Sequence, residues 1–337
     1  MAARRGEGFT EDELVGVIRK VLSGEGPGVI VGPGDDAAVL ESGRGLTVAT
    51  TDMLVEDVHF ERSMVSARDL GAKAIVVNVS DIAAMAASPR YALVSLGFAA
   101  DVDVAWVIEL FGGMRAACDE YALSLVGGDL NRSPQTVVSV TVIGEVARGR
   151  AVLRSGARPG DRVVVTGTLG ASAGGLLLAR AGGSSVTTPW GRELMEAHFR
   201  PVARIGEAAT LAQAGATAMM DISDGLLLDL SRLCAESAVG ARVELDRVPV
   251  AEALGELRSA VADADPLQLA LSGGEDYELL ASIDPAAVEP ATAKLEDRFG
   301  VRLTDIGEIT DTGLTVVDAE GNERPLEAGG WDHFASR

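Results

Sequence analysis

Residues 49–60 read ATTDMLVEDVHF, and the rest of the chain is interpreted outward from this stretch. It places Asp52 directly after a short apolar run and His59 seven residues further on. An acidic side chain at the end of a strand points into a cleft, and the local sequence offers no Lys or Arg to pair with it. A carboxylate in such a place needs a cation. The stretch therefore predicts that Asp52 is a metal ligand.

Four more acidic clusters lie beside glycine or at the expected start of a helix: Asp35–Asp36, Asp81, Asp129, and Asp221 with Asp224. Some have structural alternatives. An Asx turn would explain the pair in GPGDD. A helix N-cap would explain Asp81, which follows the buried segment AIVVNV and is expected to open the helix DIAAMAA.

The other two clusters are better placed for function. Asp129 ends the expected strand LVGGD, where paired glycines let the backbone approach a ligand. Asp221, Ser223 and Asp224 gather at one expected helix N-terminus, which suits phosphate or metal-bound phosphate. Carboxylate oxygens are the ligands that Mg²⁺ prefers. We therefore expect the clusters to converge on Mg²⁺ ions around phosphate groups.

Composition excludes several classes of protein. Apolar residues make up 47% of the 337 residues, so the chain has enough of them to fold. The formal net charge is −21, which argues against a nucleic-acid partner. Cys118 and Cys234 lack the number and spacing of a disulfide framework or a metal site, so we expect buried thiols in a reducing compartment. Without an apolar leader or a membrane-length run, we expect a cytoplasmic protein with no membrane partner.

Strands and helices are expected to alternate in both halves, which predicts two α/β domains. The first element is a helix at Glu11–Leu22. The polar, glycine-containing segment Arg150–Asp161 marks the boundary, so the predicted domains are residues 1–149 and 150–337. The second half contains the turn GTLGASAGG, which lacks the Lys-Ser/Thr of a phosphate-binding loop. Close helix packing is the preferred explanation of its glycines.

Other catalytic chemistry has little support. The three histidines, His59, His198 and His333, show no arrangement with a nucleophile, and the cysteines lack zinc-ligand spacing. His59 by itself is better explained as a structural histidine. Oxygen ligands and Mg²⁺ remain.

Eight motifs, in order, carry a resemblance to a known family: GDDAAVL, TTDMLVEDVHF, NVSDIAAMAASP, GGDLNRS, RSGARPGD, DISDGL, SGGEDYEL and GGWDHF. The motifs lie between Gly34 and Phe334, and the resemblance extends from Phe9 to Phe334. In order and approximate spacing the chain resembles the thiamine-monophosphate kinases of the AIR synthetase-like superfamily. Asp57 and Ala86 depart from the pattern, because they stand where this family often has or is expected to have glycine.

The resemblance implies a two-domain AIR synthetase-like fold of the α/β (α+β) class. The N-terminal domain would bind ATP and Mg²⁺ and join strands with a second copy into a dimeric β-barrel. The activity implied is ATP-dependent phosphorylation of thiamine phosphate to thiamine diphosphate, with several Mg²⁺ ions, in a homodimer.

The resemblance also implies roles for individual residues. The metal ligands would be Asp36, Thr50, Thr51, Asp52, Asp81, Asp129, Asp221 and Asp224. The nucleotide contacts would be Gly128, Asp129, Arg154 and Ser223. The thiamine-phosphate contacts would be His59, Glu275 and Trp331. Catalysis itself would depend on Asp52, Asp129 and Arg154.

Physical chemistry agrees with this assignment. The nucleophile would be a phosphate monoester with a second pKa near 6, so it needs no general base at neutral pH. Two dianions about 5 Å apart repel by about 13 kcal/mol at an effective dielectric near 20, which calls for metal ions and arginine. We therefore expect direct in-line transfer without a phospho-enzyme.

Two kinds of alternative stay open. One is another enzyme of the superfamily, such as AIR synthetase, selenophosphate synthetase or the hydrogenase maturation dehydratase. Selenophosphate synthetase is expected to show a reactive Cys and Lys near the N-terminus, whereas this chain has Lys20 there and no cysteine before Cys118. The other is a non-catalytic nucleotide-binding regulatory protein, which would have no need to keep every metal carboxylate.

Overall fold

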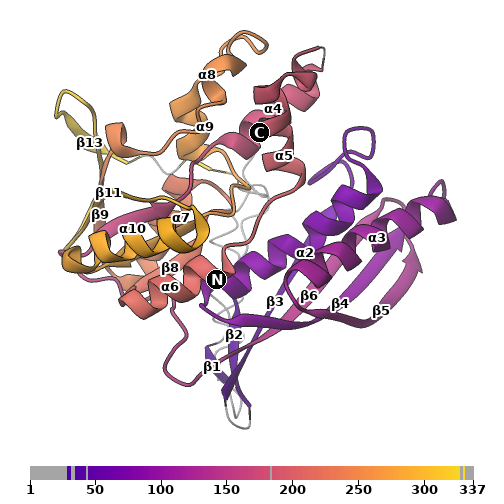
Figure 1. Ribbon diagram of the computed structural model, residues 1–337, viewed down its shortest axis with the longest axis horizontal. Coiled ribbons are helices and arrows are strands. Elements are labelled where there is room, and N and C mark those ends of the chain that lie inside the picture. Colours follow the sequence, from indigo (N-terminus) through magenta and orange to yellow (C-terminus); the bar gives the residue numbers. More distant parts are fainter. Residues whose placement is uncertain (1–28, 32–34, 43–44, 183, 327–328, 331–337) are drawn as a thin grey trace, which may run out of the picture.

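The computed structural model describes residues 29–31, 35–42, 45–182, 184–326 and 329–330. The helix expected at residues 11–22 and the residue Trp331 lie outside this part of the chain. The described residues form two sheets, each with helices packed against it (Figure 1). The mixed α/β class expected from the alternation of elements is confirmed.

The N-terminal sheet has six strands in the order β1-β2-β3-β6-β4-β5. Only β4 and β5 are parallel neighbours. Within the described residues this sheet is open, with β1 and β5 at its edges. The strands are β1 (Val29–Val31), β2 (Ala38–Ser42), β3 (Gly45–Val55), β4 (Ser88–Phe98), β5 (Ser124–Arg132) and β6 (Val137–Val146).

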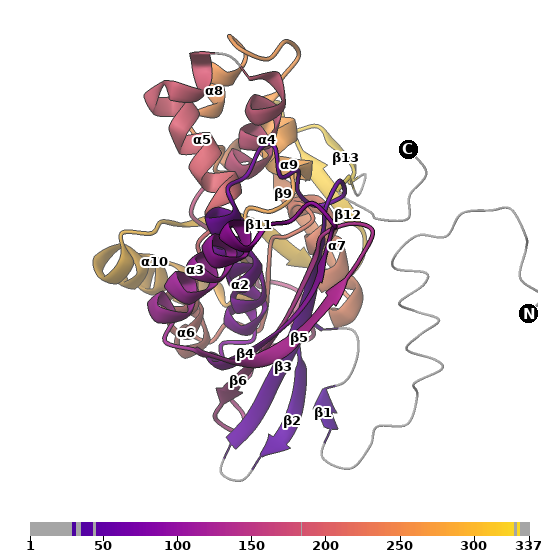
Figure 2. The ribbon, with the colours of Figure 1, turned by 90° about the vertical axis from the view of Figure 1, so that its right-hand side faces the viewer.

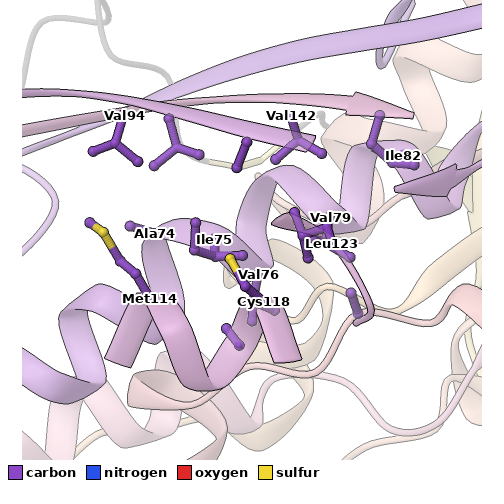
Figure 3. Close-up of a cluster of buried hydrophobic side chains, with 14 of the residues drawn as sticks. Ala74, Ile75, Val76, Val79, Ile82, Val94, Met114, Cys118, Leu123 and Val142 are labelled. Atoms are coloured by element: carbon purple, nitrogen blue, oxygen red, sulfur yellow. The ribbon is translucent and has the colours of Figure 1, made fainter. Parts of the chain in front are cut away.

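Helices α2 (Ala67–Ala84) and α3 (Val104–Glu120) cover one face of this sheet, and no other helix of the described residues covers the opposite face (Figures 1 and 2). Figure 3 shows Ile75 and Val79 of α2 between Val142 of the sheet and Cys118 of α3. The helix therefore has apolar neighbours on opposite sides, which suits its many buried apolar residues.

The course of α2 corrects one expectation. The segment AIVVNV and the residues DIAA after it form one continuous helix, so Asp81 lies in its last turn and does not open a second helix. A helix N-cap role for Asp81 is therefore wrong. Burial between the sheet and α3 outweighs the low helix propensity of the valines and isoleucine.

Two positions where the family resemblance expects glycine have left-handed backbone. The φ angle is 66° at Asp57 and 54° at Ala86. Ala86 follows the C-cap of α2, where its N–H donates to Ala83 O and the N–H of Ala87 donates to Ile82 O. Glycine is the usual residue there because it lacks the Cβ that makes this conformation costly.

The C-terminal sheet has seven strands in the order β13-β12-β9-β11-β7-β10-β8, in which only β12 and β9 are parallel neighbours. The strands are β7 (Arg162–Thr166), β8 (Ala218–Asp221), β9 (Gly240–Glu244), β10 (Leu279–Ile283), β11 (Leu303–Thr310), β12 (Leu314–Val317) and β13 (Glu323–Pro325). The predicted domain boundary falls in the connection between β6 and β7.

Helices cover both faces of this second sheet. On one face lie α7 (Leu226–Ser237) and α9 (Pro266–Ser272), and on the other α6 (Ile205–Ala214) and α10 (Pro285–Phe299). A further apolar cluster joins α4 (Ala171–Ala181), α5 (Pro189–Phe199) and α8 (Leu254–Leu257), which Figure 1 shows beyond the sheet. Short 3₁₀ helices occupy Ser184–Thr187 and Leu245–Arg247.

The glycine-rich turn before α4 is explained by packing, as expected. A Cβ on Gly175 would lie 2.1 Å from the carbonyl oxygen of Leu194, so α4 can approach α5 only without it. Cys118 and Cys234 are buried and unpaired. None of the helices in the described residues has both the length and the apolar character to cross a membrane.

Candidate functional site

A cleft of about 1060 Å³ lies between the two domains. Helix α2 forms part of its wall through Lys73, Val77 and Asp81, which repeat at helical spacing. The helix also touches β8 and α6 of the second domain, so it supports residues from both halves of the chain. The carboxylates of Asp36, Asp81 and Asp221 form the acidic end of the cleft, and Phe60, Leu176 and Phe199 belong to its more apolar end.

Three carboxylates meet at the acidic end. Oxygen atoms of Asp36, Asp81 and Asp221 all lie within 4.8 Å of one another. They come from the turn before β2, the last turn of α2 and the end of β8. The position of Asp81 adds to the local negative potential, because the C-terminal end of a helix carries the negative end of its dipole.

The pKa values of these groups are raised. Loss of hydration raises the pKa of Asp81 and of Asp221 well above its usual value, and mutual repulsion within the cluster adds to this shift. Burial and the nearby Asp224 raise the pKa of Asp52 to about 6. Acids that resist ionisation in this way gain from a bound cation.

Asp52 lies inside β3 and not at its end. The strand register pairs β3 with β2 from Gly45 to Ala49, and the N–H of Asp52 donates to Asn78 Oδ1 at 2.9 Å. The hydroxyl of Thr50 donates to Asp81 Oδ2 at 2.6 Å. Side chains alternate along a strand, so Thr51 points to the opposite face of the sheet from Thr50 and Asp52, and its hydroxyl donates to Val140 O. Thr50 and Asp52 thus face the acids, whereas the Thr51 hydroxyl does not.

Arg154 is the cation nearest the three carboxylates. It forms a two-pronged ion pair with Asp36, with N···O distances of 2.9 and 2.8 Å. Its own backbone N–H donates to Asp35. The arginine expected to hold phosphate is therefore paired with an expected metal ligand, and it offsets one of the negative charges in the cluster.

The loop 222–225 is organised by Asp229, a residue that sequence reasoning missed. Asp229 Oδ2 accepts from the backbone N–H groups of Ser223, Asp224 and Gly225 at 3.0–3.1 Å. Because these N–H groups already donate to the Asp229 carboxylate, they do not form the phosphate-binding site expected at the start of α7. Arg232 pairs with both Asp224 and Asp229.

Gly128 and Asp129 are not brought to the cleft. GGD lies within β5, an edge strand, and Asp129 is exposed and accepts from Asn131 Nδ2. A Cβ on Gly128 would lie 1.8 Å from Val94 O. In this chain the glycine is therefore required by the contact of β5 with β4.

Two of the three expected thiamine-phosphate contacts, His59 and Glu275, line the cleft. His59 Nδ1 accepts from Val55 N–H at 3.1 Å, so any proton on the neutral ring is carried by Nε2. Glu275 lies beside Lys73 and His198. Trp331 lies outside the described residues. Apolar side chains around these groups include Phe60, Leu176 and Phe199.

A serine, a histidine and a glutamate meet nearby without forming a catalytic relay. Ser172 Oγ lies 3.0 Å from His198 Nδ1, and Glu275 Oε2 lies 3.2 Å from the same nitrogen. A relay needs the serine and the acid on opposite ring nitrogens. Burial lowers the pKa of His198 to about 4, with the charge of Lys73 as the next cause, so the ring is neutral.

Comparison with known proteins follows the same two-domain division. The family model for the N-terminal domain of AIR synthase related protein matches residues 34–146 of this chain, and the model for the C-terminal domain matches residues 158–319. A thiamine-monophosphate kinase of Aquifex aeolicus is 36% identical over 321 residues, covering 95% of this chain and 97% of that protein. The chain belongs to the thiamine-monophosphate kinase family. Another family member, from Mycobacterium tuberculosis H37Rv, is 40% identical over 255 residues, covering 75% and 74% of the two chains.

Solved structures agree with membership of the thiamine-monophosphate kinase family. The structure of AaThiL complexed with AMPPCP and TMP has a TM-score of 0.86 and 34% identity, and covers 99% of each chain. The hydrogenase maturation protein HypE in complex with ATP reaches a TM-score of 0.69 at 22% identity, which shows a shared fold alone. The resemblance based on the eight motifs is therefore confirmed.

Several residues of the site have no role that the sequence predicts. Lys73, Ser80, Asp229 and Arg232 each contact a predicted site residue. Ser80 Oγ donates to Asp221 Oδ2 at 2.5 Å and so joins α2 to β8. Lys73 carried a usable signal, because a lysine inside an otherwise apolar helical segment needs a buried partner.

Proposed function

We propose that this chain, a member of the thiamine-monophosphate kinase family, transfers the γ-phosphoryl group of ATP to thiamine phosphate and forms thiamine diphosphate. The observation that carries the proposal is the cluster Asp36, Asp81 and Asp221 at one end of a cleft whose other end is more apolar. Such a cleft suits a molecule with both an anionic and an aromatic part. AaThiL, solved with AMPPCP and TMP, is a relative of matching fold.

The donor set at the acidic end fits Mg²⁺. Three carboxylates within 4.8 Å of one another carry more negative charge than Arg154 alone offsets. Hard oxygen donors in such a group suit Mg²⁺. We propose that Asp36, Asp52, Asp81, Asp221 and Asp224 hold these ions, with Thr50 orienting Asp81. Bound Mg²⁺ would neutralise phosphate oxygens during the transfer.

The side chains of the cleft supply placement and electrostatics. The attacking group is a phosphate that is already ionised at neutral pH, so no residue needs to remove a proton. We assign His59 and Glu275, which both line the cleft, to the acceptor; the proton of a neutral His59 ring is on Nε2, because Nδ1 accepts from Val55 N–H. Arg154 is placed to contact phosphate while it remains paired with Asp36. Ser223 contributes through its side chain or carbonyl, since Asp229 occupies its N–H.

The roles of Gly128 and Asp129 depend on a second copy of the chain. By strand register Asp129 lies in one row with Ser95, Ser139 and Met53, on the sheet face that α2 and α3 leave uncovered (Figure 2). That face also carries Leu93, which is 40% exposed, while Met53 is 54% exposed. Burying this face in a dimeric barrel would remove apolar surface from water and place Asp129 at the interface.

The homodimer has a direct test. Leu93→Glu would place a charge on the face buried in the barrel, and light scattering should show a shift from dimer to monomer. Exposed Ile108 of α3, on the opposite side of the domain, gives the control Ile108→Glu, which should stay dimeric. A dimeric Leu93→Glu variant would argue against this face.

Domain boundaries at residues 149 and 150, and a cytoplasmic location, complete the proposal. The boundary is supported by the family models, which leave residues 147–157 between them. The cytoplasmic location is supported by two buried cysteines without a disulfide.

The activity is tested by phosphorus NMR of the purified protein with ATP, Mg²⁺ and thiamine phosphate. The expected result is a thiamine diphosphate resonance, distinct from those of ADP, that grows as the ATP γ signal and the thiamine phosphate monoester signal decline together. ADP formation without that resonance would refute the proposal. Direct transfer is tested separately with ATP alone, because covalently phosphorylated protein would indicate a phospho-enzyme route instead.

A further inference from the structure

Lys73 is a buried cation that the proposed transfer does not use. Its side chain is 4% exposed. The ammonium group donates to Glu275 Oε2 and to the carbonyl oxygen of His198, both at 2.9 Å. Lys73 belongs to the N-terminal domain, whereas both acceptors belong to the C-terminal domain. An ammonium group so enclosed persists only where such partners are fixed around it.

Glu275 lies on a strained loop attached to the acidic end of the cleft. Its φ angle is 67°, and that of Tyr277 is 52°. The N–H of Glu275 donates to Ser223 O at 2.7 Å, and that of Tyr277 donates to Ile222 O at 2.9 Å. Left-handed backbone at two residues other than glycine is retained when surrounding contacts fix it. The position of Glu275 is therefore tied to the loop between Asp221 and Asp224.

Glu275 differs electrostatically from the other acids of the cleft. Burial acts to raise its pKa, but the charge and hydrogen bond of Lys73 bring the pKa below its usual value. The cluster at the acidic end shows the opposite shift. Glu275 is thus an ionised carboxylate at neutral pH without any metal ion.

The surroundings of this carboxylate suit an organic cation. The side chain of Glu275 is 27% exposed and lines the cleft. The ring of Phe199 meets that of His198, the other neighbour of Glu275, with centroids 4.7 Å apart. A carboxylate beside aromatic surface attracts a flat cation and repels phosphate. The thiazolium ring of thiamine phosphate is a flat cation that carries its phosphate on a flexible arm.

We propose that Lys73 is a positioning residue that holds Glu275 ionised and turned toward the cleft, where Glu275 offsets the positive charge of the acceptor's thiazolium ring. The inference rests on the proposed function, since it takes thiamine phosphate as the acceptor. It adds a basis for selectivity: a cationic ring is preferred over a neutral ring of the same shape. It also explains why a lysine is buried in α2.

The test compares Lys73→Met with Lys294→Met, a change of the same kind at an exposed position of α10. For Lys73→Met the KM for thiamine phosphate should rise about 10- to 100-fold, the loss expected for one charge-assisted contact. The KM for ATP should change little. Lys294→Met should match the unaltered chain in both constants.

The pH profile separates positioning from a structural role. The titratable groups facing Glu275 are Lys73 of α2, His198 of α5, His59 after β3, and Asp276 and Tyr277 of its own loop. Without Lys73, burial should raise the pKa of Glu275, so the KM for thiamine phosphate should climb as pH falls from about 8 to 6. The double variant Lys73→Met/Glu275→Gln should lose this climb, because no carboxylate remains to titrate. It should also recover thermal stability lost by Lys73→Met.

Binding measured by calorimetry keeps this inference distinct from the proposed function. The unaltered chain should bind thiamine phosphate at least about tenfold more tightly than a neutral thiophene analogue, and Glu275→Gln should remove this preference. Equal binding of both by the unaltered chain would overturn the inference even if the enzyme forms thiamine diphosphate. An equal rise of both KM values in Lys73→Met with a flat pH profile would also overturn it. A chain that binds thiamine phosphate selectively but forms no thiamine diphosphate would contradict only the proposed function.

Discussion

The cluster of Asp36, Asp81 and Asp221 should make the protein less stable when no metal ion is bound, so removing one carboxylate should stabilise it. Two unit charges 4.8 Å apart repel by about 3.5 kcal/mol at an effective dielectric near 20. Asp221→Asn removes two such repulsions and keeps an oxygen that can accept from Ser80. Protonation relieves part of the strain in the unaltered chain, so we expect a gain of about 2 kcal/mol in the free energy of unfolding near pH 8.

Mg²⁺ should reverse the order of stability of Asp221→Asn and the unaltered chain. Binding at a hundredfold excess over Kd adds about 2.7 kcal/mol to the stability of the unaltered chain. Asp221→Asn should gain much less, because it lacks one proposed ligand. Urea unfolding followed by circular dichroism, in EDTA and in Mg²⁺, measures both differences. The variant should be the more stable protein in EDTA and the less stable one in Mg²⁺.

Asp161→Asn is the matched control. Asp161 is 7% exposed and accepts from Thr217 Oγ1 at 2.6 Å, away from the cluster. Its replacement should lower stability equally in both buffers. If Asp221→Asn behaves like Asp161→Asn, with the same loss in EDTA and in Mg²⁺, the reasoning about repelling carboxylates is refuted.

Four further predictions concern single residues. Asp52→Asn should abolish transfer in the phosphorus NMR assay while nucleotide binding weakens less, and normal turnover would remove Asp52 from the site. Ala86→Gly should raise the free energy of unfolding by about 1 kcal/mol in urea, because φ is 54° there, and a loss would show that the Cβ is not strained. The pKa of His198 is lowered to about 4, so its protonation favours the unfolded chain, and the free energy of unfolding should fall as pH drops from about 6.5 to 4. In urea titrations at several pH values, His198→Gln should reduce that fall by up to about 3 kcal/mol. An unchanged fall would contradict the lowered pKa. Asp229→Ala leaves three N–H groups without their acceptor and should lower the free energy of unfolding by about 3 kcal/mol. It should also remove most of the stabilisation that Mg²⁺ gives. Unchanged Mg²⁺ stabilisation would show that the loop at residues 222–225 does not depend on Asp229.

The family, the α/β class and the acidic residues Asp36, Asp81 and Asp221 could be inferred from the sequence, because each depends on local pattern. Asp229 was missed, and Asp129 lies away from the cleft. Ordered motifs preserve the family. Left-handed backbone requirements also leave a local trace, which is why Asp57 and Ala86 stood out as departures from glycine before their φ angles were known. The glycines of GTLGASAGG were expected to serve helix packing, and Gly175 does so against Leu194.

Only the tertiary structure decided which charges meet. Lys73 and Glu275 are 202 residues apart, and Arg154 reaches Asp36 across 118. Sequence spacing predicts periodicity within an element, but it carries no information on which side chains are enclosed together after the two sheets pack around α2. That packing made Asp81 part of a helix end instead of a helix start and gave the N–H groups of residues 223–225 to Asp229. Residue types thus set the available chemistry, and burial at one junction set the partners, because the energy of a charge depends on its distance from water and from other charges.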